Sequence, residues 1–229
     1  MIRLIGYLFL AVFMATGCKE ELHPPEMDKL LRFEHDGPQE LPADGASTIT
    51  YRVILDPRTD TSIKVVDFTT TCGTFAGSTT YRAPILSDRT ASAVLRAGRD
   101  VGPCSIKVSV ASLSREEKIT LVLARPNSMD LELSAYTVDT ASNATVTLTV
   151  DAMRTIGMPT KDQPVWFTFE PDTSLTGLVL PTMKTIDENG NCTATLANPF
   201  KRAGAFVIKA KMIAVTGDTL EASRTVVYQ

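Results

Sequence analysis

Apolar and polar side chains alternate along most of the chain. Between residues 48 and 55 every second position is apolar, with Ile49, Tyr51, Val53 and Leu55 on one face. A period of two is typical of a β-strand that buries one face. No segment carries a sustained apolar stripe at a period of 3.6 residues. The pattern therefore predicts an all-β protein.

The alternating pattern returns about 100 residues later in the chain. Val146, Leu148 and Val150 repeat the alternation of the first run. The offset between matched segments grows only between strands, as expected when insertions are confined to loops. The sequence thus predicts an internal duplication of a unit of about 100 residues. The matched segments are Val66-Asp67-Phe68-Thr69 with Val165-Trp166-Phe167-Thr168, Ala93-Val94-Leu95 with Ala194-Thr195-Leu196, and Gly102 to Lys107 with Gly204 to Lys209.

These patterns divide the chain into four parts. Residues 1–17 are predicted to be a lipoprotein signal peptide, and residues 18–28 a lipidated cysteine with a flexible tether. Residues 29–125 form the first predicted domain, and residues 126–229 form the second. The boundary lies at Arg125-Pro126-Asn127, because proline cannot donate a hydrogen bond to a strand ladder.

The first 18 residues have the character of an export signal. Arg3 precedes an apolar run from Leu4 to Thr16, which is too short to span a bilayer but suits a secretory signal. Ala15-Thr16-Gly17-Cys18 resembles a lipobox, which implies a membrane anchor through lipid on Cys18. The lipobox family usually has leucine at the place of Ala15, so ordinary signal-peptide cleavage stays open as an alternative.

Three charged residues follow the predicted lipid site. Lys19-Glu20-Glu21 resembles the export signal of surface lipoproteins in the Bacteroidota. This resemblance implies the outer membrane, with the domains facing the cell exterior. The alternative is a solvated start to the tether, which leaves the periplasmic face open as a location.

Several turn and core motifs resemble the bacterial Ig-like group 1 domains that occur as tandem arrays in invasin and intimin. The resemblance implies two tandem immunoglobulin-like antiparallel β-sandwiches that act as rods, spacers or adhesive modules. Fold resemblance alone does not define a function. The motifs are Leu41-Pro42-Ala43-Asp44-Gly45, Gly73-Thr74-Phe75, Pro164-Val165-Trp166-Phe167-Thr168 and Asp187-Glu188-Asn189-Gly190.

An Ig-like arrangement also brings two cysteines together. Cys72 ends one predicted strand and Cys104 begins another. The Ig-like fold makes these two strands antiparallel neighbours, and an exported protein keeps disulfides. We therefore expect a Cys72–Cys104 disulfide, with two separate small apolar side chains as the alternative. Cys192 shares a predicted strand face with Ala194 and Leu196, and we expect it to be a buried, unreactive thiol.

Composition argues against catalysis and nucleic-acid binding. The formal net charge is −3, whereas nucleic-acid binding requires a concentrated basic face. Neither His23 nor His35 lies in a motif with a nucleophile. Asp187, Asn189 and Asn191 alternate like calcium ligands, but no bidentate glutamate follows at the required spacing. We expect no enzyme activity, no metal and no cofactor.

One aromatic residue is a candidate partner contact. Alternation points Val165 and Phe167 inward and Trp166, the single tryptophan, outward. An exposed indole is typical of binding hot spots, although cover by loops or by the domain boundary is an alternative. The second functional hypothesis is a carbohydrate-binding accessory lipoprotein. Thr140 and Thr219 follow aspartates in segments that resemble a bacterial O-glycosylation motif.

Overall fold

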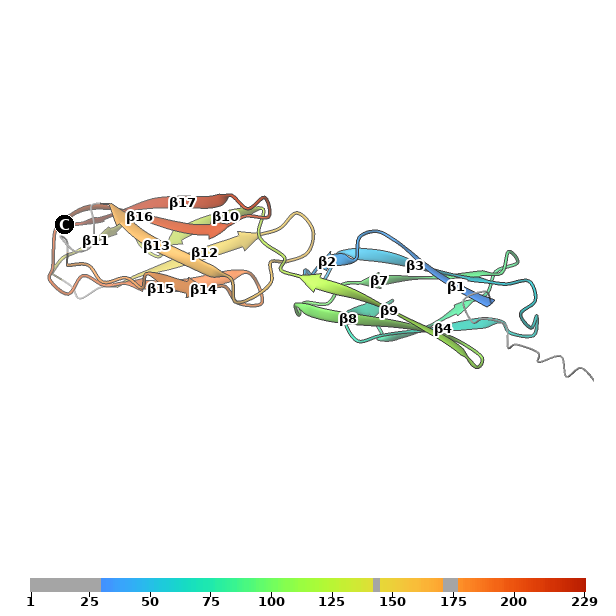
Figure 1. The fold of residues 1–229 in the computed structure, drawn as a ribbon. Coiled ribbons are helices and arrows are strands. Elements are labelled where there is room, and N and C mark those ends of the chain that lie inside the picture. Colours follow the sequence, from blue (N-terminus) through green and yellow to red (C-terminus); the bar gives the residue numbers. More distant parts are fainter. Residues whose placement is uncertain (1–29, 142–144, 171–176) are drawn as a thin grey trace, which may run out of the picture.

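The computed structural model describes residues 30–141, 145–170 and 177–229, which fold into two β-sandwiches. The sandwiches lie end to end, and the C-terminus lies at the end of the second sandwich that is remote from the first (Figure 1). Each has its own apolar core. Within the described ranges no helix is long and apolar enough to cross a membrane. The prediction of two tandem Ig-like β-sandwiches is confirmed.

Two sheets form the first sandwich. The four-stranded sheet has the order β1-β3-β7-β5, and the five-stranded sheet has the order β2-β9-β8-β4-β6. The first sheet contains β1 (Leu31–Asp36), β3 (Thr48–Leu55), β7 (Thr90–Arg96) and β5 (Thr74–Phe75). The second contains β2 (Glu40–Pro42), β9 (Leu113–Val122), β8 (Gly102–Val110), β4 (Val65–Thr70) and β6 (Thr80–Pro84).

The second sandwich repeats this arrangement. Its sheets have the orders β10-β12-β15 and β11-β17-β16-β13-β14. The three-stranded sheet contains β10 (Ser128–Leu133), β12 (Val146–Met153) and β15 (Asn191–Leu196). The five-stranded sheet contains β11 (Thr137–Val138), β17 (Thr219–Tyr228), β16 (Gly204–Ile213), β13 (Pro164–Glu170) and β14 (Met183–Thr185).

Matched strands occupy matched places in the two sandwiches. β4, β8 and β9 of the first correspond to β13, β16 and β17 of the second in both strand order and sequence offset. The backbone conformation also repeats at the start of two matched strands. The glycines that open β8 and β16 have nearly the same positive φ, 145° at Gly102 and 142° at Gly204. The duplication inferred from the sequence is therefore a duplication of the fold.

Each sandwich also contains a short parallel strand pair beside its antiparallel pairs. β2 pairs in parallel with β9, and β11 pairs in parallel with β17. The cause is a crossing of the chain from one sheet to the other. In the first sandwich the chain leaves β1, passes Gly37 at a φ of 126° and enters the opposite sheet as β2.

The alternation read from the sequence places the core. Along β3 the burial alternates residue by residue, and Ile49, Tyr51, Val53 and Leu55 are all buried. Phe68 and Phe75 fill the space between the sheets with their ring centroids 5.8 Å apart. Burial of each large apolar side chain contributes about 1.5–3 kcal/mol to folding.

Candidate functional site

The outer face of β13 carries the exposed tryptophan. Val165 and Phe167 are 0% and 4% exposed, whereas Trp166 is 38% exposed. The outward orientation expected from alternation is confirmed. On the two flanking strands, the residues opposite Trp166 are Met183 of β14 and Lys211 of β16. Met183 is itself 52% exposed, so indole and thioether together form an apolar surface, which we call the Trp166 face.

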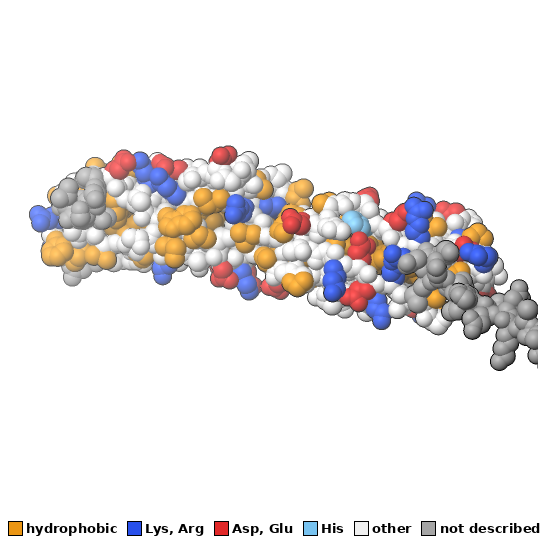
Figure 2. Space-filling model, in the orientation of Figure 1, with side chains coloured by type: hydrophobic (Ala, Val, Ile, Leu, Met, Phe, Trp, Pro, Cys, Tyr) orange, Lys and Arg blue, Asp and Glu red, His pale blue; other side chains and the backbone are white. Residues whose placement is uncertain are grey.

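Hydrophobic side chains gather over β13 and β16 on the visible side of the second sandwich (Figure 2). Charged groups of the same sheet border the Trp166 face and neutralise one another. Lys211 Nζ lies 2.9 Å from Glu221 Oε2, and Lys209 forms an ion pair with Glu170. The hydrogen bond from Lys211 lowers the pKa of Glu221 below its ordinary value, and the hydrogen bond to Glu170 raises the pKa of Lys209.

The equivalent position in the first sandwich is polar. Asp67 of β4 corresponds to Trp166, and its partner on the edge strand is Arg82 of β6. Arg82 Nε donates to Asp67 Oδ1 at 2.9 Å. The same fold therefore accepts an exposed ion pair at this position. An apolar Trp166–Met183 pair is thus not a requirement of the sandwich.

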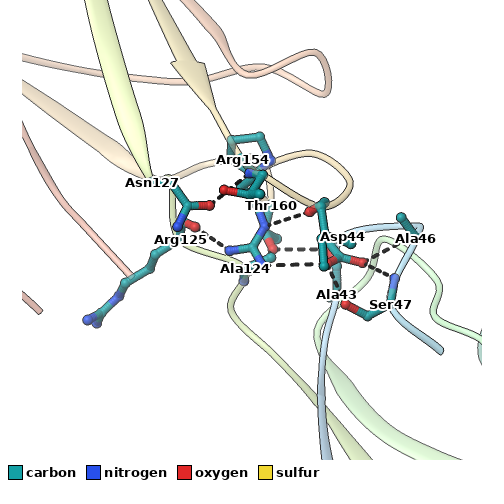
Figure 3. Close-up of polar contacts among 12 residues, drawn as sticks. Ala43, Asp44, Ala46, Ser47, Ala124, Arg125, Asn127, Arg154 and Thr160 are labelled. Carbon is teal, nitrogen blue, oxygen red and sulfur yellow. Dashed lines mark hydrogen bonds and ion pairs between the residues drawn. The ribbon is translucent and has the colours of Figure 1, made fainter. Parts of the chain in front are cut away.

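A second notable region is the joint between the sandwiches, where a buried ion pair crosses the boundary (Figure 3). Arg154 Nη2 lies 3.4 Å from Asp44 Oδ2, and their side chains are 8% and 0% exposed. Arg154 also donates to the carbonyl oxygens of Arg125 and Ile156. Asp44 was predicted only as a turn residue, and it also serves that role.

Asp44 is held in its turn by local donors. Its Oδ1 accepts from the backbone amides of Ala46 at 2.8 Å and Ser47 at 2.7 Å, and its Oδ2 accepts from Ser47 Oγ. Burial alone would raise the pKa of Asp44. The hydrogen bonds from Ser47 and Ala46, together with the charge of Arg154, outweigh that effect and lower the pKa below its ordinary value of 3.8. The carboxylate is therefore the stable form at neutral pH.

Buried polar groups complete the joint. Thr160 Oγ1 accepts from the Ala124 amide at 2.9 Å and donates to the Ala43 carbonyl at 3.2 Å. Gln163 Nε2 donates to the Ala124 carbonyl at 3.0 Å. Gly157 approaches closely, since a Cβ there would lie 2.4 Å from the Asp44 carbonyl oxygen. The loop between β12 and β13 is thus fitted to the end of the first sandwich.

Arg99 also joins the two sandwiches. Its Nη2 donates to the carbonyl oxygens of Pro159 at 3.1 Å and Glu188 at 2.5 Å. The sequence did not single out Arg99, Arg154, Thr160 or Gln163. Each lies in a loop whose partner is distant in the chain, and a local pattern carries no signal for such a contact.

The predicted disulfide is present. Cys72 is bonded to Cys104 with a Cα–Cα distance of 5.3 Å. β4 and β8 are antiparallel neighbours, and Thr70 pairs with Ile106 just inside the bridge. Cys192 is a free thiol, 3% exposed, and burial raises its pKa. The expectation of an unreactive thiol agrees with this environment.

The segment with alternating calcium-type ligands is a turn. Asp187 Oδ1 accepts from the amides of Asn189 and Asn191, both at 2.8 Å, and Gly190 has a φ of 83°. This carboxylate oxygen is therefore engaged in closing the turn between β14 and β15, which lie in different sheets. No cluster of three or more metal-ligating side chains occurs among residues 30–141, 145–170 and 177–229.

The remaining predicted site residues have varied positions. Cys18, Lys19, Glu20 and Glu21 lie outside the described residues, as does His23. His35 Nε2 lies 3.0 Å from Glu117 Oε1. Thr140 is partly exposed and Thr219 is exposed. Thr140 Oγ1 donates to the Gln229 carbonyl at 3.2 Å.

Comparison with known proteins places the fold. No protein-family model matches the chain, and no curated protein matches it. Solved structures do match. The bacterial integrin-binding protein invasin superposes with a TM-score of 0.65 and 16% identity over 86% of this chain. The adhesin InvE of Yersinia pseudotuberculosis does so with a TM-score of 0.53 and 19% identity, also over 86%.

The chain has the fold of tandem invasin-type Ig-like domains. It covers 39% of the invasin chain and 58% of the InvE chain, so it is equivalent to a part of each. At these identities the likeness shows the fold and not the binding partner. Any shared role has to be argued from the surface of this chain.

Proposed function

We propose that the chain is a non-enzymatic surface lipoprotein that binds a protein partner through the Trp166 face. The observation that carries this proposal is the contrast between equivalent positions, an Asp67–Arg82 ion pair in the first sandwich and Trp166–Met183 in the second. Tryptophan is enriched in binding hot spots, and exposed apolar side chains at paired strand positions favour an interaction surface. The first sandwich then acts as a spacer.

The joint supports the spacer role. A buried Asp44–Arg154 ion pair and the buried contacts of Thr160 and Gln163 tie the two sandwiches together. Breaking a buried pair by removing one partner is strongly destabilising, which opposes free rotation at the boundary. A stiff pair of domains would hold the Trp166 face at a fixed position relative to the first sandwich.

Site-specific photocrosslinking on intact cells tests the partner contact. A photoreactive residue at Met183 should give one discrete crosslinked product that depends on Trp166. The matched control is the same residue at Arg82, the equivalent edge-strand position in the first sandwich. Products of the same mass from both positions, or a Met183 product that persists in Trp166→Ala, would contradict the proposal.

Anchoring and display are tested separately. The Cys18→Ala variant should move the protein from the membrane fraction to the soluble fraction. Retention of that variant in the membrane after an alkaline wash would exclude the lipid anchor on Cys18. Protease added to whole cells should remove the domains if they face the exterior. Full protection beside a cleaved surface control would place them in the periplasm.

Carbohydrate binding is the second candidate, because an exposed indole can also stack on a sugar ring. The cross-strand neighbours of Trp166 are a methionine and a lysine, which offer no second aromatic platform at those two positions. This favours a protein partner, as an adhesion module or a subunit of an outer-membrane complex. Binding on a glycan array that is abolished by Trp166→Ala would reverse the preference.

A further inference from the structure

The first sandwich has an incompletely paired strand. Within the residues that the structure describes, β7 pairs with β3 along its length but with β5 only at Leu95 and Arg96. β5 is short because a two-residue turn follows it. Ala76 and Gly77 both have positive φ, 48° and 87°, and the amide of Ser78 donates to the Phe75 carbonyl at 3.0 Å. The chain then enters β6 in the other sheet.

The hydrogen bonds between β7 and β3 show which backbone groups of β7 face this open edge. The amide of Ala97 donates to the Ser47 carbonyl at 2.8 Å, and the amide of Leu55 donates to the Arg89 carbonyl at 3.0 Å. In an antiparallel pair, the residues that bond to one neighbour alternate with residues that face the other side. Odd-numbered residues of β7 therefore bond to β3. The N–H and C=O groups of Ser92 and Val94 point away from β3.

A groove runs beside these groups. It has a volume of about 410 Å³, and its lining includes Phe75, Tyr81, Ala93 and Val94. Phe75 and Ala93 are buried, Tyr81 is half-buried, and Val94 is 51% exposed. The groove is therefore largely apolar, with backbone donors and acceptors along one side. Arg96 stands at the end where β5 begins, and its Nε donates to the Gly45 carbonyl.

We infer that the edge of β7 at Ser92 and Val94 binds an extended segment of a partner polypeptide by strand addition. Outward N–H and C=O groups that recur every second residue match the spacing of another β-strand. The partner strand would alternate, with an apolar side chain in the groove against Phe75 and Tyr81. A folded surface or a sugar would not supply this repeating hydrogen-bond pattern.

The second sandwich has an equivalent edge with different side chains. Thr193 and Thr195 of β15 correspond to Ser92 and Val94, and β15 pairs with β12 in the same phase, since the amide of Ala152 donates to the Gly190 carbonyl. Beyond β15, Val179 and Ala197 exchange two hydrogen bonds of 2.9 Å. A polar threonine thus replaces the exposed valine, and Thr195 is a matched control position.

A linear 12-residue peptide library displayed on phage, selected against the purified full chain, supplies the probe. The enriched peptide should carry alternating apolar positions, and its binding should slow hydrogen exchange at the Ser92 and Val94 amides. Val94→Pro removes the outward N–H and keeps the bonds to β3, as proline is tolerated on strand edges. This variant should weaken binding of the peptide at least about tenfold, whereas Thr195→Pro should leave the affinity for the peptide unchanged.

Tyr81→Ser provides a second variant in case Val94→Pro disturbs folding. It alters the groove wall without changing a residue of β7, and it should also weaken binding of the peptide. The inference is overturned if no peptide is enriched, or if the enriched peptide binds both variants as tightly as it binds the native chain. A concentration-dependent dimer that Val94→Pro converts to a monomer would also overturn it, by showing a second copy of this chain at the edge.

Discussion

On the strand next to the edge of the five-stranded sheet, the first sandwich exposes Asp67 and the second exposes Trp166. The edge-strand partners differ in the same way, Arg82 in the first and Met183 in the second. Both pairs occupy the same place in the same strand order. Packing cannot explain a difference between two solvent-facing pairs on one fold. The comparison therefore separates residues that the fold needs from residues that binding of a partner would favour.

The cores differ at another pair of equivalent positions. Cys104 is the third residue of β8 and forms the disulfide with Cys72, whereas Phe206 is the third residue of β16. Phe206 is 5% exposed and packs edge-on against Tyr228, with centroids 6.1 Å apart. A covalent link in one sandwich thus has an aromatic contact as its counterpart in the other.

The largest expected effect comes from removing the aromatic contact of Phe206 in the second sandwich. Phe206→Ala should lower the free energy of unfolding of the second sandwich by about 3–5 kcal/mol, because it removes a buried ring and leaves a cavity. Fluorescence of Trp166, the single tryptophan, reports on the second sandwich during denaturant unfolding. An unchanged transition in this signal would contradict the role assigned to Phe206.

Removal of the disulfide should affect only the first sandwich, by a slightly smaller amount. The double variant Cys72→Ala/Cys104→Ala opens a loop of sequence separation 32, which should cost about 3–4 kcal/mol in the chain-entropy description. Calorimetry should show the first transition lowered while the Trp166 fluorescence transition stays in place. Reductant on the native chain should reproduce the shift, and Cys192→Ser under the same reductant is the control.

These pairs also show how far the sequence alone could go. Alternation predicted β3, β4 and β13 correctly because burial of one sheet face imposes a period of two. The Cys72–Cys104 bridge followed from strand adjacency in an Ig-like fold. The short β2 and β11 were missed, since three and two residues are too few to show a period.

The side-chain contacts across the joint were also missed, for a different physical reason. Asp44 has the local sequence of an ordinary turn residue, and its hydrogen bonds to Ala46 and Ser47 satisfy that role. Its contact with Arg154 spans 110 positions. Only the folded end of one sandwich against the other creates this contact, so no local pattern could have indicated it. The open edge of β7 could not be predicted from the sequence either, because it depends on the residue at which β5 ends.

Exchange of the exposed pairs sharpens the central comparison. The double variant Trp166→Asp/Met183→Arg gives the second sandwich the same residue pair as Asp67 and Arg82 in the first. The free energy of unfolding should change by less than about 1 kcal/mol, because exposed pairs contribute little to stability. Crosslinking from a third residue of the same face, Thr185, should fall about tenfold or more. A large loss of stability would mean that Trp166 serves the fold.

The smallest expected effect is the loss of stability when Asp44 at the joint is protonated, which leaves both partners of the ion pair in place. The pKa of Asp44 in the folded chain lies below its ordinary value of 3.8. A lowered carboxyl pKa means that the stabilisation is complete above pH 3.8 and is lost as the pH falls through the folded-state pKa. A protonated Asp44 can still form hydrogen bonds, so this loss should be smaller than that caused by deleting a core ring.

The Asp44→Asn variant isolates this titration. Asparagine keeps an oxygen that can accept from the Ala46 and Ser47 amides, but it has no charge for Arg154 and does not titrate. The difference in free energy of unfolding between the native chain and Asp44→Asn should be constant near neutral pH and shrink below pH 3.8. Other carboxylates titrate in both proteins and cancel in the difference. A difference that stays constant down to pH 2.5 would show that the charge on Asp44 does not stabilise the joint.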